Sequence, residues 1–129
     1  MRLNSDCVRD ILLTVEEKCD YHHVMDYDRE NSNNNRLQDY THEEIIYHIK
    51  QCDCSKLILG TTYYDGGKLI IITDLSPAGH QFLANIREDT VWKGVKEVAN
   101  KVGSSSLSAL TQISSNIITQ LIKAQFNLP

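Results

Sequence analysis

The sequence has no long apolar run. None of its hydrophobic stretches approaches the roughly 18 residues that a membrane-spanning helix needs, so we expect no membrane partner. No apolar segment follows the polar N-terminus, as one does in a secretory signal. These absences favour a cytoplasmic protein, in which the four cysteines are reduced thiols rather than a disulfide framework.

An excess of positive charge is also lacking. Thirteen Lys and Arg stand against 17 Asp and Glu, which gives a formal net charge of −4 at pH 7. Proteins that hold nucleic acid non-specifically normally present a basic face, because they neutralise phosphates with Lys and Arg. The composition therefore argues against a strong non-specific hold on DNA or RNA.

Catalytic signatures are absent. The chain has no Gly-rich phosphate loop, no nucleophile elbow and no carboxylate pair at catalytic spacing. Ser76, His80 and Asp74 could be drawn as a nucleophile set, but Ser76 is fully explained as a helix cap. We expect no enzymatic activity and no cofactor.

A zinc site is the one metal hypothesis that the spacing allows. His48 and Cys52 lie four residues apart, as two ligands on one helix face would, and Cys54 follows directly. Further candidate ligands are Cys19, His22 and His23. The alternative is a core Cys52, a surface His48 and a mobile His22-His23 pair. Structural zinc sites usually show two tight Cys/His pairs, so we expect no metal.

The segment from Lys56 to Arg87 organises the rest of the chain. Residues 57–64 are rich in strand-forming side chains, and residues 69–73 form an apolar return strand that needs cover on both faces. Between them, Asp65-Gly66-Gly67 supplies the positive φ angles of a tight turn. Ser76 then caps a helix that begins at Pro77.

Three further helices are predicted before the C-terminal segment. The first runs from about Ser5 to Lys18 with Asn4 as its N-cap. The second covers residues 41–52, where Thr41 and Glu44 form a capping box. Its expected core residues are Ile45, Ile46, Ile49 and Cys52, and its expected exposed residues are Tyr47, His48 and Lys50. A later helix is capped by Asp89 or Thr90 and ends at Gly103.

Residues 19–40 form the least regular part. Tyr21, His23, Met25 and Tyr27 alternate with polar residues, which permits an edge strand. Residues 28–35, DRENSNNN, are typical of a polar loop.

The C-terminal segment, residues 104–129, has only one charged side chain, Lys123. An apolar helical stripe runs through it, so the helix should either lie across its own domain or pair with a second copy. We favour a homodimer and divide the chain into a domain of residues 1–103 and a dimerisation helix of residues 104–129. The predicted interface residues are Leu107, Leu110, Ile113, Ile117, Leu121 and Ala124.

These elements together predict an α+β fold, a winged-helix-like domain that is mostly helical, has one β-hairpin wing and carries a C-terminal apolar helix. Three phrases, LNSDCVRDILLTVEE, EEIIYHIKQC and LSPAGHQFLANIREDTVW, resemble those of the domain-of-unknown-function family twenty-five-thirteen, a group of small bacterial and prophage proteins. The resemblance implies a winged-helix-like fold and supplies no activity or site residue. The family pattern has a glycine between the second helix and the hairpin, whereas residues 51–56 here, QCDCSK, contain none.

Two functions follow from a winged-helix scaffold. The fold alone does not decide function, and winged helices also serve as protein-interaction modules. Because the chain lacks an excess of positive charge, we favour a non-enzymatic module that binds an unknown protein partner or takes part in assembly. The alternative is a DNA-binding regulator, in which the helix of residues 41–52 enters the major groove and the wing of residues 57–73 touches the backbone. The residues that would contact DNA are His42, Tyr47, His48, Lys50, Gln51, Lys56 and Lys68.

Overall fold

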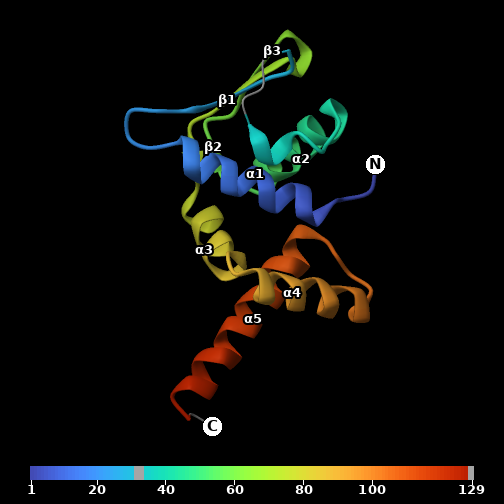
Figure 1. Ribbon diagram of the computed structural model, residues 1–129, viewed down its shortest axis with the longest axis vertical. Coiled ribbons are helices and arrows are strands. Elements are labelled where there is room, and N and C mark those ends of the chain that lie inside the picture. The colour runs from blue at the N-terminus through green and yellow to red at the C-terminus, as the bar shows by residue number, and fades with distance from the viewer. Residues whose placement is uncertain (31–33, 128–129) are drawn as a thin grey trace. The chain divides into compact units, whose positions relative to one another are not determined.

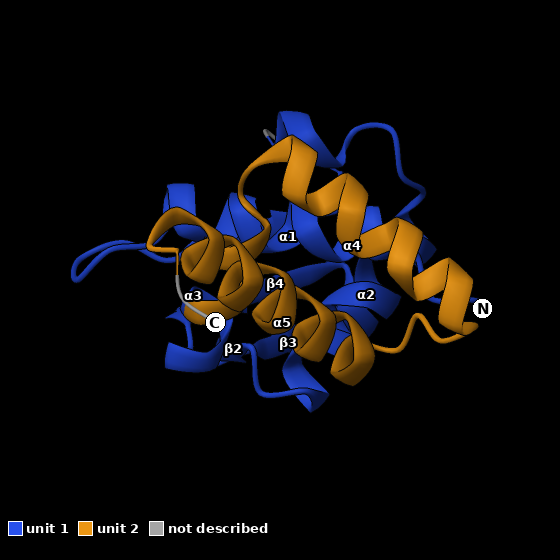
Figure 2. Cartoon of the chain, turned by 90° about the horizontal axis from the view of Figure 1, so that it is seen from below, with its two compact units in different colours: residues 1–80 blue, residues 81–129 orange. Residues whose placement is uncertain are grey.

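A computed structural model describes residues 1–30 and 34–127. The chain has an α+β architecture with five α-helices and two small antiparallel sheets in this described part. It divides into two compact units, residues 1–80 and residues 81–129 (Figure 2). Part of the predicted polar loop of residues 28–35, namely residues 31–33, lies outside the described residues.

The first unit begins with two helices that pack against each other (Figure 1). Helix α1 covers Ser5–Lys18, as predicted, and Asn4 Oδ1 accepts the backbone N–H groups of Asp6 and Cys7. Helix α2 covers His42–Cys54, and its capping box between Thr41 and Glu44 is confirmed. A strand, β1 (Met25–Asp28), and a short 3-10 helix, η1 (Asn35–Leu37), connect the two.

The predicted ribbon is present. Strand β3 (Thr62–Tyr64) turns through the 3-10 segment η2 (Asp65–Gly67) into β4 (Leu69–Ile72), and all three turn residues have positive φ. Strand β1 pairs with the other edge of β4, so the order is β1-β4-β3. Only one face of β4 is closed, because Ile70 and Ile72 are buried while Leu69 and Ile71 are half-buried.

The predicted first strand of the ribbon is wrong in one respect, because it is broken at Gly60. Strand β2 (Ile58–Leu59) pairs instead with β5 (Asp74–Leu75) in a sheet of its own. Gly60 has a φ of 62°, and a Cβ at this position would lie 2.2 Å from Thr73 Oγ1. The chain bends here because glycine allows both this φ and the close approach of Thr73.

Helix α2 ends without the family's glycine. Lys56 takes the left-handed conformation, with φ of 60°. The N–H of Lys56 donates to the carbonyl of Asp53, and the N–H of Leu57 donates to the carbonyl of Cys52. This is the hydrogen-bond pattern of a Schellman cap, in which glycine is the usual residue because it has no Cβ to clash.

Helix α3 (Pro77–Ile86) starts as predicted, since Ser76 Oγ accepts the N–H of Gly79 at 2.9 Å. In the second unit, α4 (Asp89–Val102) packs against α5 (Leu107–Gln125). Gly103, with φ of 74°, ends α4 as predicted. The predicted cap of α4 at Asp89 or Thr90 is wrong, because the N-cap is Glu88 and Asp89 lies in the first turn.

The core of the first unit lies between α1, α2 and β4. Helix α1 contributes an apolar stripe with the spacing of one helix face, and α2 and the central strand meet it with aliphatic side chains and a thiol. Burial of these side chains is the main stabilising contribution to this unit. The fully buried members are Cys7, Ile11, Leu12, Val15, Ile49, Cys52, Ile70 and Ile72.

Candidate functional site

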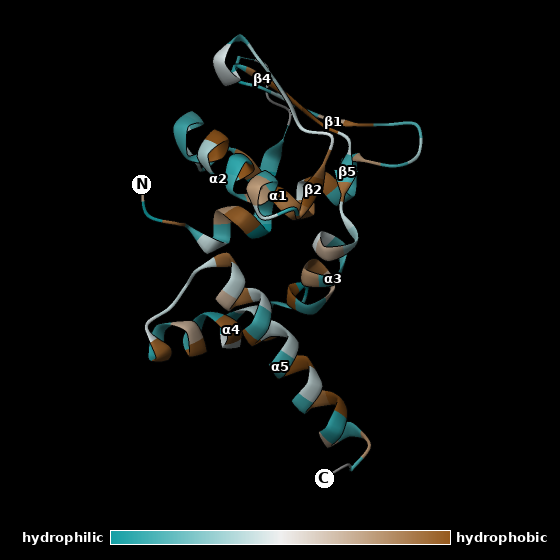
Figure 3. Cartoon of the chain, turned by 180° about the vertical axis from the view of Figure 1, so that it is seen from behind, coloured by the Kyte–Doolittle hydropathy of each residue, from teal (hydrophilic) through white to brown (hydrophobic). Residues whose placement is uncertain are grey.

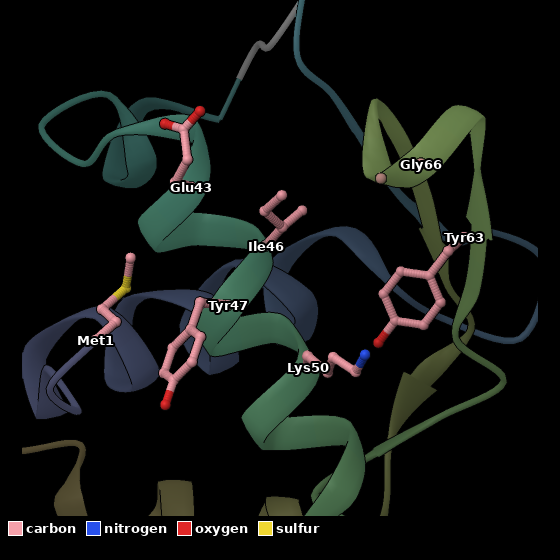
Figure 4. Close-up of a pocket in the computed structure, with 8 residues that line it drawn as sticks. Met1, Glu43, Ile46, Tyr47, Lys50, Tyr63 and Gly66 are labelled. Carbon is pink, nitrogen blue, oxygen red and sulfur yellow. The ribbon is translucent and has the colours of Figure 1, made fainter.

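A groove of about 590 Å³ extends across α2, from Met1 on one side to the β3–β4 ribbon on the other (Figure 4). Its volume falls within the range of about 300–1,000 Å³ that is usual for ligand-binding clefts. The walls are mainly apolar and aromatic, with one acidic and one basic side chain. The lining residues are Met1, Glu43, Ile46, Tyr47, Lys50, Tyr63, Gly66 and Gly67.

Helix α2 supplies one wall with a second stripe, distinct from its core stripe. Residues 45, 48, 49 and 52 are buried in the core. Glu43, Ile46, Tyr47 and Lys50 repeat the same spacing of three, four and seven residues, and therefore share another face. Ile46 and Tyr47 are half-buried, whereas Glu43 and Lys50 are exposed. The middle of the groove wall is thus apolar, and its two ends are charged.

The ribbon supplies the facing wall. The Tyr63 hydroxyl donates to Asp53 Oδ2 at 3.1 Å, and this bond ties the ribbon to the last turn of α2. Partial burial of the Tyr63 phenol, together with that bond, raises its pKa. At Gly67, which has a φ of 95°, an added Cβ would lie 3.3 Å from Ile46 Cγ2, so the turn itself packs against α2.

Buried polar contacts fix the direction in which α2 faces. His48 Nδ1 lies 2.7 Å from the carbonyl of Glu44, and His48 Nε2 accepts the backbone N–H of Asn4 at 2.7 Å. At the start of α2, the His42 ring stacks on Tyr27, and His42 Nδ1 lies 2.8 Å from the Tyr27 hydroxyl. The groove face therefore rests on contacts to both α1 and β1.

The predicted exposure of His48 is wrong, because its side chain is fully buried and cannot reach DNA. Ile46, predicted in the core, lines the groove instead. Among the other predicted DNA contacts, Tyr47 and Lys50 line the groove, and His42 and Gln51 are half-buried. Lys56 and Lys68 are exposed outside the groove lining, beyond the C-terminal end of α2 and beyond the ribbon turn, respectively.

The histidine that anchored the zinc hypothesis has both ring nitrogens engaged, one with Glu44 and one with Asn4. Cys52, four residues on, is fully buried, and burial raises the pKa of its thiol. Within residues 1–30 and 34–127, no three His, Cys, Asp or Glu side chains are placed to hold a metal ion. The alternative of a core Cys52 therefore describes this helix better, although His48 is not at the surface.

The side chains of α2 and β3 that line the groove and that sequence reasoning missed are Glu43, Ile46 and Tyr63. A signal for the first two is in the sequence, since residues 43, 46, 47 and 50 have the spacing of one helix face. Tyr63 carries no such signal. Its place depends on the pairing of β3 with β4, which brings it opposite Ile70.

The predicted dimer residues fall into two groups. Leu107 and Leu110 are buried in α5, which packs on α4, so they are not available to a second copy. Ile113 and Ile117 are half-buried, while Leu121 is 51% exposed and Ala124 is also exposed. Hydrophobic residues continue along α5 to its C-terminal end (Figure 3). In the described part of the chain, no helix has the length and apolar content to cross a bilayer.

Comparison with known proteins agrees with the resemblance seen in the sequence. The family profile described as "Hypothetical protein (DUF2513)" matches residues 2–106, which is most of the chain. The chain belongs to the DUF2513 family. A protein of Haemophilus influenzae described as "Uncharacterized protein" is 29% identical over 124 residues, covering 95% of this chain and 99% of the relative. No solved structure matches. The DUF2513 match ends at residue 106, directly before α5 begins.

Proposed function

We propose that this DUF2513 protein is a non-enzymatic interaction module whose first unit binds a protein partner in the groove between α2 and the ribbon. The same proposal assigns the unit to the winged-helix class. Support comes from the strand order β1-β4-β3 and from α2, which precedes the ribbon in the chain and flanks it in space. In DNA-binding winged helices the helix at this place enters the major groove.

One observation carries the choice of a protein partner over DNA. The exposed face of α2 has Ile46 and Tyr47 at its centre and Glu43 at its N-terminal end. A helix that approaches phosphates needs cations or neutral donors there, because a carboxylate repels them. Apolar and aromatic side chains at the centre with charges at the rim are instead typical of protein interfaces.

DNA binding has weaker support. Lys50, Lys56 and Lys68 are exposed near this face, but His48 is buried. Fluorescence anisotropy of mixed-sequence duplexes at low and moderate salt tests the alternative. A protein that neutralises Z phosphates binds best at low salt, since its affinity falls with a salt slope of about −0.9Z. Because the exposed face of α2 carries Glu43, we expect no measurable affinity even at about 50 mM salt. Salt-dependent binding that Lys50→Ala and Lys68→Ala weaken would instead favour DNA.

Selection of displayed peptides on the full-length protein tests the proposed function directly. We expect enriched peptides that bind the wild type and lose about tenfold in affinity on Tyr47→Ala, because an aromatic side chain at an interface centre is a typical hot spot. Tyr64→Ala is the matched control, since Tyr64 is a 49% exposed ribbon tyrosine outside the groove lining. Peptides that respond equally to both variants, or no enrichment at all, would contradict the proposal.

Assembly is the second part of the proposal. We propose that the outer half of α5 together with its C-cap, residues 117–126, pairs with the same segment of a second copy. Leu121, Ile122 and Phe126 are 51%, 51% and 70% exposed. Lys123 is the single charged residue of residues 104–129, so two such helices meet with little electrostatic repulsion. This revises the predicted interface by removing Leu107, Leu110 and Ile113.

A further inference from the structure

The groove is bracketed by opposite charges on a single helix face. Glu43 and Lys50 are seven residues apart on α2, which corresponds to two turns and a rise of about 10 Å. Ile46 and Tyr47 lie between them, as the close-up shows (Figure 4). Along the helix, the groove wall therefore presents an acidic, an apolar, an aromatic and a basic side chain in turn.

Both bracketing charges are available to a ligand. Glu43 and Lys50 are exposed, and in the described part of the chain neither has a hydrogen bond or an ion pair. The Tyr63 hydroxyl, by contrast, is already engaged in a hydrogen bond to Asp53. The charges thus stand at the two ends of a surface whose middle is formed by Ile46 and Tyr47.

We infer that the groove binds a peptide segment of a partner protein that presents an apolar side chain between one acidic and one basic residue, placed to meet Lys50 and Glu43. This inference rests on the proposed function and specifies the partner's chemistry. The segment is about as long as two helical turns, because its charges must span the distance between Glu43 and Lys50.

Charge complementarity sets this occupant apart from two others. Duplex DNA is a uniform polyanion, so it pairs with Lys50 but is repelled by Glu43. The outer half of α5 from a second copy carries Lys123 as its single charge, so it could pair with Glu43 and would leave Lys50 without a partner. Only a segment with both signs of charge satisfies both ends of the groove.

The test uses short synthetic helical peptides that share one apolar face and differ in two charged positions at the spacing of Glu43 and Lys50. One peptide carries Glu and Lys, the second two Glu, and the third two Lys. We expect the full-length protein to bind the mixed peptide about fivefold more tightly than either other peptide. Each exposed ion pair contributes up to about 1 kcal/mol, and 1.4 kcal/mol is tenfold in affinity.

Variants with a reversed charge at Glu43 or Lys50 provide the decisive comparison. Glu43→Lys should shift the preference to the peptide with two Glu, and Lys50→Glu should shift it to the peptide with two Lys. Glu97→Lys and Lys101→Glu are the matched controls, because both residues are exposed on α4 and outside the groove lining, and they should leave the preference unchanged. Thermal unfolding of every variant confirms that the fold is intact.

The possible results separate this inference from the proposed function. Peptides that need Tyr47 but show no preference among the three charge patterns overturn the inference and leave the protein-binding function standing. The inference also fails, and the function stands, if displayed peptides use the groove while none of the three synthetic peptides binds. If no peptide of either kind depends on Tyr47, both fail. Displacement of the mixed peptide by duplex DNA, or by an excess of the protein itself, identifies another occupant and also overturns the inference.

Discussion

The backbone N–H of Asn4 donates to Nε2 of His48 at 2.7 Å, across 44 residues of sequence. Because Nε2 accepts, the proton of the neutral ring sits on Nδ1 and is donated to the Glu44 carbonyl, 2.7 Å away. Asn4 is also the N-cap of α1. One imidazole therefore joins the start of α1 to the middle of α2 and holds the groove face at a fixed rotation.

We expect His48→Ala to reduce the free energy of unfolding by about 2 to 4 kcal/mol, because it leaves the Asn4 N–H without its acceptor and opens a cavity in the core. Urea denaturation followed by circular dichroism measures the change. His80→Ala is the control, since His80 is exposed and its loss should change stability by at most about 0.5 kcal/mol. Equal effects of the two substitutions would show that the Asn4–His48 bond does not support the fold.

Gly79 and Gly94 both lie inside helices, yet we predict opposite effects of alanine at the two positions. A Cβ on Gly79 would lie 2.0 Å from the Leu57 carbonyl oxygen, whereas a Cβ on Gly94 would meet nothing within 4 Å. Gly79→Ala should therefore destabilise by about 1 to 3 kcal/mol through steric overlap. Gly94→Ala should stabilise by about 0.5 to 1 kcal/mol through helix propensity.

The two glycine variants control each other in one set of thermal or urea unfolding curves. Helix propensity alone predicts a gain at both positions, so a stabilised Gly79→Ala protein would contradict the close contact between α3 and residue 57. The contact has a second support, because Ser76 Oγ donates to the Lys56 carbonyl at 2.6 Å and the Ser76 N–H donates to the Leu57 carbonyl.

Lys56→Gly should raise the free energy of unfolding by about 1 kcal/mol. A non-glycine residue in the left-handed conformation costs roughly 1 to 2 kcal/mol, and part of the gain is lost because glycine makes the unfolded chain more flexible. Urea denaturation measures the difference. Lys56→Ala should give no such gain, since alanine keeps the Cβ. Ser55→Gly, at a neighbour with φ of −84°, should be slightly destabilising. A gain with alanine as large as with glycine would point to the lysine charge instead.

The rotation of α2 shows what the sequence could have predicted and what it obscured. At about 100° per residue, His48 lies about 60° from Ile45 and on the same side as Cys52, while Ile46 lies about 100° away on the other side. Geometry alone places His48 nearer the core than Ile46. Side-chain polarity suggested the reverse, with the polar His48 at the surface and the apolar Ile46 in the core. A buried histidine is tolerated only with a hydrogen-bond partner, and that partner, the Asn4 N–H, is distant in sequence.

The starts of α1, α2 and α3 and the ribbon turn were predictable because their signals are local. Asn4, Thr41 with Glu44, Ser76 and the turn at residues 65–67 act on neighbours within four residues. The break at Gly60 was not, because it depends on Thr73, which lies between β4 and β5 and is distant in sequence. The groove has the same origin, since Tyr63 and Gly67 reach α2 only after the ribbon has folded against it.

Stability should fall as the pH rises above 9. Burial, with smaller contributions from the Glu44 and Asp10 carboxylates, raises the pKa of the Cys7 thiol from 9.0 to about 12. Below pH 9 both states keep the proton. Between pH 9 and about 12 only the unfolded chain releases it, so unfolding becomes more favourable by up to about 1.4 kcal/mol per pH unit per thiol. Urea midpoints from neutral pH to about pH 10, with a non-thiol reductant, measure the slope.

Two cysteine variants, one double and one single, test the source of this slope. Cys7→Ala with Cys52→Ala should flatten the decline, because burial also raises the pKa of the Cys52 thiol. Cys54→Ser should leave the decline unchanged, since Cys54 is exposed. Measurement stops near pH 10 because Tyr40, whose raised pKa comes from burial and its bond to Asp10, adds a similar effect at higher pH. A slope that survives in the double variant would exclude the two buried thiols as its source.

Leu121→Asp should convert the proposed dimer into a monomer, because it places a carboxylate in the middle of the apolar surface of residues 117–126. Size-exclusion chromatography with light scattering at tens of micromolar should give twice 14.7 kDa for the wild type and a single 14.7 kDa for the variant. Gln120→Asp is the matched control, since this neighbour is exposed and polar, and it should remain dimeric.

Leu110→Asp separates the two roles of α5. Leu110 is 1% exposed, so the variant should lower stability instead of only dissociating the dimer. A monomeric wild type would show that the exposed end of α5 does not join two copies, and a dimeric Leu121→Asp protein would place the interface elsewhere.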